Sequence, residues 1–406
     1  MTATVDNLQP PVEGKRTGGL QKKKKEYANP FIGFAWLRIV GAALVILQHS
    51  WSLVDPADAS ILPPVFHLGE FGMLAFFAMS GFQVQNSWDE DPSWWRYTGR
   101  RLLRLLPPLA FLLALTAFVI GPIFTTLPVG EYLTNPATWT YMFGTIPFLF
   151  QHQLPGLFEN NPHNFSENPA LWTLPMELVG YAGVLVIGVL IVWGVSRLLM
   201  PLVLVALLGL QAYYLFTIGE YGAGGFFFDT PLNFLTKFMV AFVAGMIFCK
   251  FRDRIKLLPS VAWALLAAWL LFNFTLAPEA AYATAGWEPS SGDNSLILIN
   301  QYLMAAAATY GAVTLAHYLP KRWERGRNWA LGSYGMYLFA GAIQQSYVFM
   351  GLDNQWLLLV ASLVTAYLFG VFSWHFIERP TFKLRKYLRA KDMSKPAPKP
   401  VGPGPV

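Results

Sequence analysis

The sequence is poor in charge and has almost no cysteine. Charged residues make up 13% of the 406 residues, whereas soluble domains carry about a quarter. The one cysteine, Cys249, excludes intrachain disulfide bonds and cysteine-based metal clusters. The chain also lacks a Walker loop and a dinucleotide fingerprint, so its motifs do not indicate a P-loop NTPase or a Rossmann dehydrogenase.

Long apolar runs take the place of these features. Hydrophobic residues make up 54% of the sequence, and the 15 tryptophans suit the two membrane–water interfaces. We predict an all-α fold, a polytopic transmembrane helical bundle of about ten spans, each near the ~20 residues that cross the hydrocarbon. The expected spans are 32–53, 65–86, 104–124, 171–195, 200–218, 232–250, 258–278, 295–318, 331–349 and 355–377.

Lys and Arg are absent from every second connection between these spans. The connections without them are 54–64, 125–170, 219–231, 279–294 and 350–354. The positive-inside rule therefore predicts a multi-pass protein of the cell (plasma or inner) membrane with both termini in the cytoplasm. The net charge of +6 is explained by this topology, so we expect membrane lipids, and no nucleic acid, as partners.

One apolar segment, 137–150, is short and interrupted by proline. Counting it as a span would move the basic clusters at 250–256 and 321–327 to the outside. We therefore interpret it as an interfacial or re-entrant element of the long extracytoplasmic loop 125–170.

The predicted organisation has three parts. Residues 1–30 form a disordered basic N-terminus, and residues 31–388 form the transmembrane domain. Residues 389–406 form a Pro/Gly-rich cytoplasmic tail, which we expect to be disordered.

The first span contains two ionisable residues, Arg38 and His49. Ionisable residues inside a span are costly and point to function by default. Eleven residues are close to three helical turns, so both side chains leave one face, roughly 16 Å apart along the axis. The structural alternatives are an arginine that snorkels to the headgroups and an interfacial histidine bonded to a carbonyl.

Glu177 lies about two turns inside the fourth span, in WTLPMEL. A carboxylate at this depth could orient His49 and stabilise its protonated form. The alternative is a protonated carboxyl that is hydrogen-bonded between helices.

Three arginines, Arg100, Arg101 and Arg104, stand at the cytoplasmic mouth of the third span. Arg101 and Arg104 share a helix face and could grip a phosphate. The alternative is ordinary positive-inside anchoring. In the second span, Ser80 and Gly81 are small enough to permit close approach of another helix.

In this order, these segments resemble the acyltransferase-3 family of integral membrane acyltransferases. The matching segments are Arg38 to His49, FFAMSGF ending at Phe82, Arg101 to Arg104 before prolines, WTLPMEL from Trp172 to Glu177, SYGMY from Ser333 to Tyr337, and Glu378 to Pro380. The resemblance covers about residues 32–388. Two positions depart from the family pattern. Thr173 replaces the usual serine, and Leu74 stands where an acidic residue is usual, with Glu70 one turn earlier as its possible substitute.

The resemblance implies an O-acyltransferase that moves an acyl group, with acetyl expected, from cytoplasmic acyl-CoA to a hydroxyl of an envelope sugar or glycolipid. It implies His49 as general base, with Arg38 and Glu177 in the catalytic site. Donor binding is expected from the basic mouth and Ser80, and acceptor binding from Trp172 and Glu70. Direct transfer and an acyl-histidine intermediate both remain open.

The 125–170 loop is the expected platform for a carbohydrate. It contains His152 and His163, but no clear third ligand accompanies them, so no metal is expected.

A competing reading of the whole chain is a transporter or flippase for a lipid-linked sugar, which would use the same buried polar residues as a transport path. A structural or signalling membrane protein would have little use for these residues.

Overall fold

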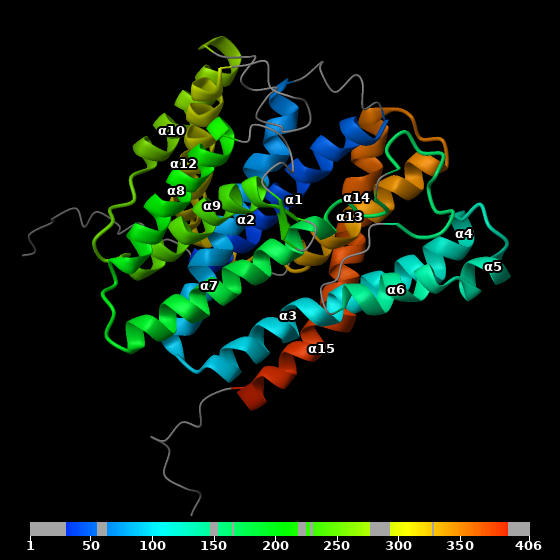
Figure 1. Ribbon diagram of the computed structural model, residues 1–406, viewed down its shortest axis with the longest axis horizontal. Coiled ribbons are helices and arrows are strands. Elements are labelled where there is room, and N and C mark those ends of the chain that lie inside the picture. Colours follow the sequence, from blue (N-terminus) through cyan, green and yellow to red (C-terminus); the bar gives the residue numbers. More distant parts are fainter. Residues whose placement is uncertain are drawn as a thin grey trace, which may run out of the picture.

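The computed structural model describes residues 30–54, 63–146, 153–164, 166–217, 225–227, 230–276, 293–326 and 329–388. These residues form a bundle of long helices (Figure 1) with almost no β-structure. The predicted disordered tails lie outside the described residues, apart from Pro30 at the start of the first helix.

The first half of the chain builds the part of the bundle that carries the polar spans. Its helices are α1 (Pro30–Val54), α2 (Pro63–Glu90), α3 (Trp94–Leu115), α4 (Gly121–Phe124), α5 (Val129–Thr134), α6 (Pro136–Thr145), α7 (Leu174–Val192) and α8 (Leu199–Thr217). A π-helical turn, η2 (Thr116–Ile120), joins α3 to α4, and a 3-10 turn, η3 (Leu171–Thr173), leads into α7.

The second half begins with a two-stranded antiparallel ribbon. Its strands are β1 (Phe226–Phe227) and β2 (Thr230–Pro231), with Phe226 opposite Pro231 and Phe227 opposite Thr230. The helices that follow are α9 (Leu232–Lys250), α10 (Pro259–Leu271), α12 (Asn294–His317), α13 (Ser333–Phe349), α14 (Gln355–Ser373) and α15 (Arg379–Phe382). Short π or 3-10 turns accompany them: η4 (Phe272–Leu276), η5 (Lys321–Glu324), η6 (Trp374–Glu378) and η7 (Lys383–Leu388).

Seven helical stretches in the described part of the chain are long and apolar enough to cross a membrane. They correspond to predicted spans one, three, four, five, six, eight and ten. The other three predicted spans coincide with α2, with α10 and its π-helical extension, and with α13. The all-helical class is therefore confirmed, while the count of ten and the cytoplasmic placement of the termini stay predictions.

Helices α2 and α9 pack closely along their lengths. A Cβ atom at Gly81 would collide with the backbone carbonyl of Phe242, and one at Gly245 would collide with that of Ala78. The close approach expected at Ser80–Gly81 is thus confirmed, and it brings Ser80 into the interior of the bundle.

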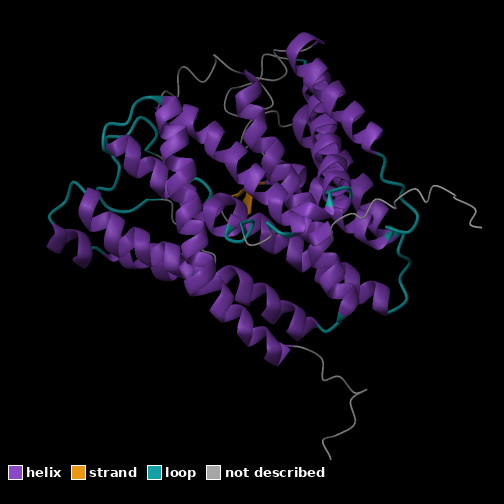
Figure 2. Cartoon of the chain, turned by 180° about the vertical axis from the view of Figure 1, so that it is seen from behind, coloured by secondary structure: helices purple, strands orange, loops and turns teal. Residues whose placement is uncertain are grey.

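Basic segments that are far apart in the sequence meet at one end of the bundle. Lys250 at the end of α9 forms an ion pair with Asp89 of α2 at 2.6 Å. Arg100 of α3 donates a hydrogen bond to the carbonyl of Leu388 at 3.2 Å. The end of η7 therefore lies beside the start of α3. Figure 2, which views the molecule from the opposite side, shows the two segments running together.

The extracytoplasmic region predicted at 125–170 contains two short helices. Asn135 caps α6 by accepting a hydrogen bond from the Ala137 amide. Pro136 occupies the first turn, where the N–H group that proline lacks would have no partner within the helix. Helix α6 packs against α3 and its π-helical turn. The predicted short element is present as a helix of 10 residues, Pro136–Thr145. Residues 147–152, including His152, lie outside the described residues.

Candidate active site

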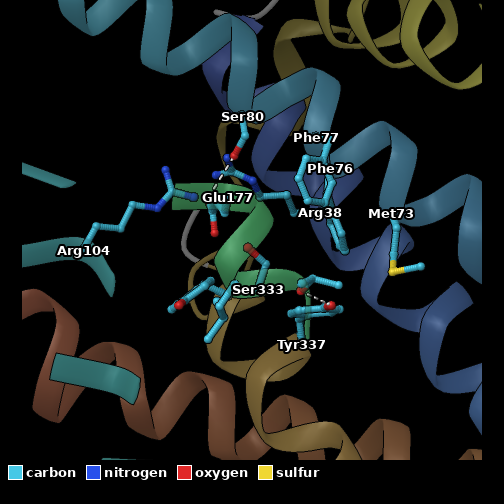
Figure 3. A pocket seen from close by; sticks show the side chains of 12 residues that line it. Arg38, Met73, Phe76, Phe77, Ser80, Arg104, Glu177, Ser333 and Tyr337 are labelled. Atoms are coloured by element: carbon cyan, nitrogen blue, oxygen red, sulfur yellow. Dashed lines mark hydrogen bonds between the residues drawn. The ribbon is translucent and has the colours of Figure 1, made fainter. Parts of the chain in front are cut away.

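A pocket lies where α1, α2, α3, α7 and α13 meet (Figure 3). Its polar members come from segments that the sequence analysis singled out. The lining residues are Arg38, Met73, Phe76, Phe77, Ser80, Arg104, Thr173, Leu174, Glu177, Ser333, Tyr334 and Tyr337. Predicted catalytic residues Arg38 and Glu177 and predicted donor-binding residues Ser80 and Arg104 are therefore brought together.

Glu177 is the acidic member of this pocket. It lies in the first turn of α7, which Pro175 helps to start. Ser80 of α2 donates a hydrogen bond to Glu177 Oε1 at 3.2 Å, and the Tyr181 hydroxyl, one turn along α7, donates to the same oxygen. These two donors fix one carboxylate oxygen and hold the side chain toward α2.

Two guanidinium groups approach Glu177 from different helices. Arg38 extends from α1 and Arg104 from α3, and Figure 3 shows their side chains on either side of the carboxylate. Arg38 donates a hydrogen bond to Gln83 Oε1 at 2.5 Å, and both arginines lie within electrostatic range of Glu177. The pocket therefore holds two positive charges against one close carboxylate, which suits an anionic ligand.

Helix α13 supplies hydroxyl groups to another wall of the pocket. Tyr337 and Thr173 are hydrogen-bonded at 2.9 Å, which ties α13 to the entry of α7. The Tyr334 hydroxyl is buried and has no hydrogen-bond partner within the described residues. Gly332 caps α13 with φ of 87°, a left-handed conformation that favours glycine and lets the helix begin at Ser333.

The three predicted arginines of the basic mouth differ in their surroundings. Arg100 pairs with Asp91 at 2.7 Å and also donates to backbone carbonyls, so it braces the turn between α2 and α3. Arg101 is buried, reaches the Ser87 hydroxyl at 3.4 Å, and lies 5.8 Å from the centre of the Tyr181 ring. Arg104 alone lines the pocket.

Asp91 anchors this end of α3 outside the apolar stretches. Arg96 binds it through two hydrogen bonds of 2.8 and 2.5 Å, and Arg100 adds a third. The hydrogen bonds from Arg96 are the largest cause that lowers the pKa of Asp91 to about 2, and Arg100 adds to their effect. The carboxylate therefore stays charged and keeps Arg96 and Arg100 in place.

His49 is not among the residues that line this pocket. It lies further along α1, half-buried, and within electrostatic range of His163 in the loop between α6 and α7. Gln344 of α13 holds this part of α1 by donating to the Ile46 carbonyl and to the Ser50 hydroxyl, both at 3.0 Å. Glu177 accepts its hydrogen bonds from Ser80 and Tyr181, and His49 is not among its hydrogen-bond donors in the described residues.

The neighbouring glutamine holds the loop that carries His163. Gln345 donates to the backbone carbonyls of His163 and Ser166, both at 2.8 Å, while Asn161 donates to the Gln345 side chain at 2.7 Å. Adjacent residues of α13 thus fix the helix of His49 and the loop of His163. Sequence reasoning did not assign these glutamines, because amides in an apolar span resemble ordinary interhelical contacts.

The two predicted acceptor-binding residues lie outside the pocket. Glu70 of α2 forms a buried ion pair with Lys237 of α9, an interaction that the isolated sequence did not indicate. Trp172 packs its ring against Phe234 and Phe238 at 5.7 and 6.0 Å. Their assignment to acceptor binding stays a prediction.

A buried carboxyl group lies in the loop between α6 and α7. Glu167 is only 2% exposed and accepts a hydrogen bond from the Leu154 amide. Desolvation by this burial raises the pKa of Glu167 to about 8. The group is therefore mostly protonated near neutral pH.

One further residue, Glu378, lies near the site although the sequence reading left it outside. Glu378 is buried, accepts a hydrogen bond from Ser373 at 3.2 Å, and lies within electrostatic range of Arg38 and Arg104. The Glu-Arg-Pro segment that contains Glu378 was the feature of the sequence that could have identified it.

In the described part of the chain, no three His, Cys, Asp or Glu side chains are grouped to hold a metal ion. That no metal is needed stays a prediction.

This fold and site define an integral membrane protein of apolar helices that enclose a charged pocket. The chain belongs to the acyltransferase-3 family, because residues 31–382 match the family described as an acyltransferase domain. The expected family and the expected acyltransferase class are both confirmed.

Two relatives are similar to this chain. Nodulation protein 10 of Rhizobium leguminosarum bv. viciae is 25% identical over 384 residues, which cover 89% of this chain and 96% of that protein. A protein of Shigella phage Sf6 named O-acetyl transferase is 26% identical over 152 residues, or 36% of this chain. That match spans 43% of the length of the phage protein. No solved structure matches the chain.

Proposed function

We propose that this protein transfers an acyl group, with acetyl expected, from cytoplasmic acyl-CoA to a hydroxyl of an envelope sugar or glycolipid. The observation that carries the proposal is the convergence of Arg38 and Arg104 on Glu177 inside a bundle that belongs to an acyltransferase family. The name of the phage relative, O-acetyl transferase, supports oxygen as the acceptor atom and acetyl as the group.

The donor would enter at the basic end of the bundle. Arg101 and Arg104 would bind its phosphates, since a guanidinium matches phosphate oxygens with two parallel hydrogen bonds. Ser80 and Arg38 would contact the pantetheine arm, whose amide groups can hydrogen-bond to both. The arm would then cover the roughly 16 Å along α1 between Arg38 and His49.

His49 would perform the chemistry at the far end of this path. Its imidazole would take the proton of the acceptor hydroxyl while the oxygen attacks the thioester carbonyl. The carbon–sulfur bond then breaks, the ester forms, and CoA leaves as a thiolate that regains a proton. The same residues also support transfer of the acyl group to His49 first, followed by attack of the acceptor.

Glu177 would act at the donor pocket, beside Arg38 and Arg104. Ser80 and Tyr181 hold its carboxylate, and that charge would keep the two guanidinium groups in position before the donor arrives. Such preorganisation reduces the reorganisation needed when the ligand binds. Trp172 and Glu70, near the α9 side of the bundle, stay the proposed contacts for the acceptor.

The test uses purified protein in nanodiscs with acetyl-CoA and a membrane glycolipid extract. We expect release of free CoA together with an acetylated lipid that mass spectrometry identifies. Absence of both products, with no binding of CoA, would contradict the proposal and favour transport of a lipid-linked sugar.

A further inference from the structure

The C-terminal segment of the described chain lies along α3. Figure 1 shows α15 in red beside α3 in cyan, and η7 continues this contact. Gly99 faces Leu388, and a Cβ atom at Gly99 would meet the Leu388 side chain at 2.9 Å. Arg100 also donates to the Leu388 carbonyl. The two segments are therefore fitted closely at the basic end.

This contact adds a fourth arginine to the basic mouth. Arg385 of η7 lies within electrostatic range of Arg100, Arg101 and Arg104. Its guanidinium sits 3.8 Å from the centre of the Phe382 ring, which presents its charge on a rigid apolar support. The sequence places Arg385 among basic residues that look like topology anchors, and only the fold brings it to α3.

Arg385 and Arg101 each keep a guanidinium donor unused. Their Nε atoms, like that of Arg100, are buried and donate to no partner within the described residues, and the hydrogen bond from Arg101 to the Ser87 hydroxyl is long, at 3.4 Å. Neither arginine forms an ion pair with a carboxylate there, whereas Arg100 is paired with Asp91. Buried guanidinium donors normally find acceptors, so both side chains have donor capacity that the described residues do not use and that an anionic ligand would satisfy.

The charge around them points to the sign of that ligand. Arg385, Arg101 and Arg104 are mutually repulsive neighbours. The carboxylates in electrostatic range of Arg104 are Glu177 and Glu378, at the pocket side. The mouth side thus keeps excess positive charge, which an anion with several oxygens would neutralise.

We propose that Arg385 and Arg101 form a phosphate site for the nucleotide end of the acyl-CoA donor. Arg100 braces the site through Asp91 and Leu388, and Arg104 marks the way to the pocket. This inference rests on the proposed function, because it assigns a further residue to donor binding. An anionic lipid headgroup carries the same phosphate chemistry, and the experiment distinguishes the two sources.

The experiment measures binding of CoA to the full chain in phosphatidylcholine nanodiscs by calorimetry. Arg385→Ala should weaken CoA binding about 10-fold, or about 1.4 kcal/mol, because it removes a charged donor to the phosphate. Arg385→Lys should recover only part of the affinity, because lysine binds phosphate as a point charge. Lys383→Ala, an exposed cation of the same segment, is the matched control and should bind as wild type.

The outcomes separate this inference from the proposed function. If the wild type binds no CoA, the proposed function fails. If the wild type binds CoA and folded Arg385→Ala binds it equally well, the phosphate site is wrong. The second arm compares phosphatidylglycerol retained by wild type and Arg385→Ala. Loss of this lipid with unchanged CoA affinity would assign the arginine to a headgroup and overturn the proposal. If the alanine variant fails to fold, Arg385→Lys gives the reading, and wild-type affinity in that variant overturns it.

Discussion

Ser80 of α2 donates a hydrogen bond to Glu177 of α7 across 3.2 Å, between residues 97 positions apart in the sequence. The contact joins the small-residue face of α2 to the first turn of α7. It also fixes the carboxylate that Arg38 and Arg104 flank. The pocket therefore receives one charged or hydroxyl group from each of four helices, α1, α2, α3 and α7, and the first prediction concerns this carboxylate.

Replacing Glu177 with glutamine removes the negative charge between two guanidinium groups. Arg38 and Arg104 would then repel each other with no carboxylate between them and would shift from the donor-binding position. We expect kcat/KM for acetyl-CoA to fall at least about 10-fold, with 1.36 kcal/mol for each tenfold step. Steady-state CoA release measures it, with Ser80→Ala as the milder companion. Wild-type kinetics for Glu177→Gln would show that the carboxylate is only structural.

Removing Arg101 and Arg104 together tests the basic mouth. The double alanine variant should weaken CoA binding first, because it removes two cations placed to bind phosphate. Calorimetry with CoA provides the measurement, and Arg197→Ala, an exposed arginine of another connection, provides the control. Unchanged donor affinity in the double variant would reduce both arginines to topology anchors.

Glu167 predicts how stability depends on pH. Its folded-state pKa is raised from 4.5 to about 8, so between these values the folded protein binds more protons than the unfolded chain. Its contribution to the free energy of unfolding therefore falls as pH rises through this window and levels off above it. Thermal unfolding of wild type and Glu167→Gln should show a flatter pH dependence for the variant. Identical pH profiles would contradict the assignment of this carboxyl as buried and protonated.

The buried pair of Glu70 and Lys237 predicts a coupled effect on folding. Neutralising one partner alone leaves an uncompensated buried charge, which costs about 3–5 kcal/mol. We expect Glu70→Gln and Lys237→Met each to lower the unfolding temperature, and the double variant to recover part of the loss. Strict additivity would show that the two side chains do not interact. A raised KM for the acceptor in a folded Glu70→Gln protein would support its predicted binding role.

Much of the donor pocket could be predicted from the sequence because ionisable residues in apolar spans are few and stand out. Arg38, Ser80, Arg104 and Glu177 come from four segments with no local contact, and the fold unites them. Whether Glu177 contacts His49 could not be predicted, since depth along separate helices does not fix which residues face each other. In the structure Glu177 lies beside Arg38, and His49 lies three turns further along α1 than Arg38.

Other features could not be read from local sequence. Lys237 gave no signal of its partner, because an ion pair between α2 and α9 depends on how the two helices pack. Basic residues of the C-terminal segment look alike in sequence, and only contact with α3 distinguishes Arg385 from its exposed neighbours. The π-helical turn after α3 likewise has no proline or glycine at its start to indicate it.

The most direct test of the account compares wild type with His49→Ala. Both proteins are purified in nanodiscs, and release of CoA from acetyl-CoA is measured with the glycolipid extract present. The account predicts release by the wild type, loss of release in His49→Ala, and equal affinity of both proteins for CoA, because His49 does not line the pocket proposed for the donor. Release at the wild-type rate by a folded His49→Ala protein would contradict the role of His49 as general base.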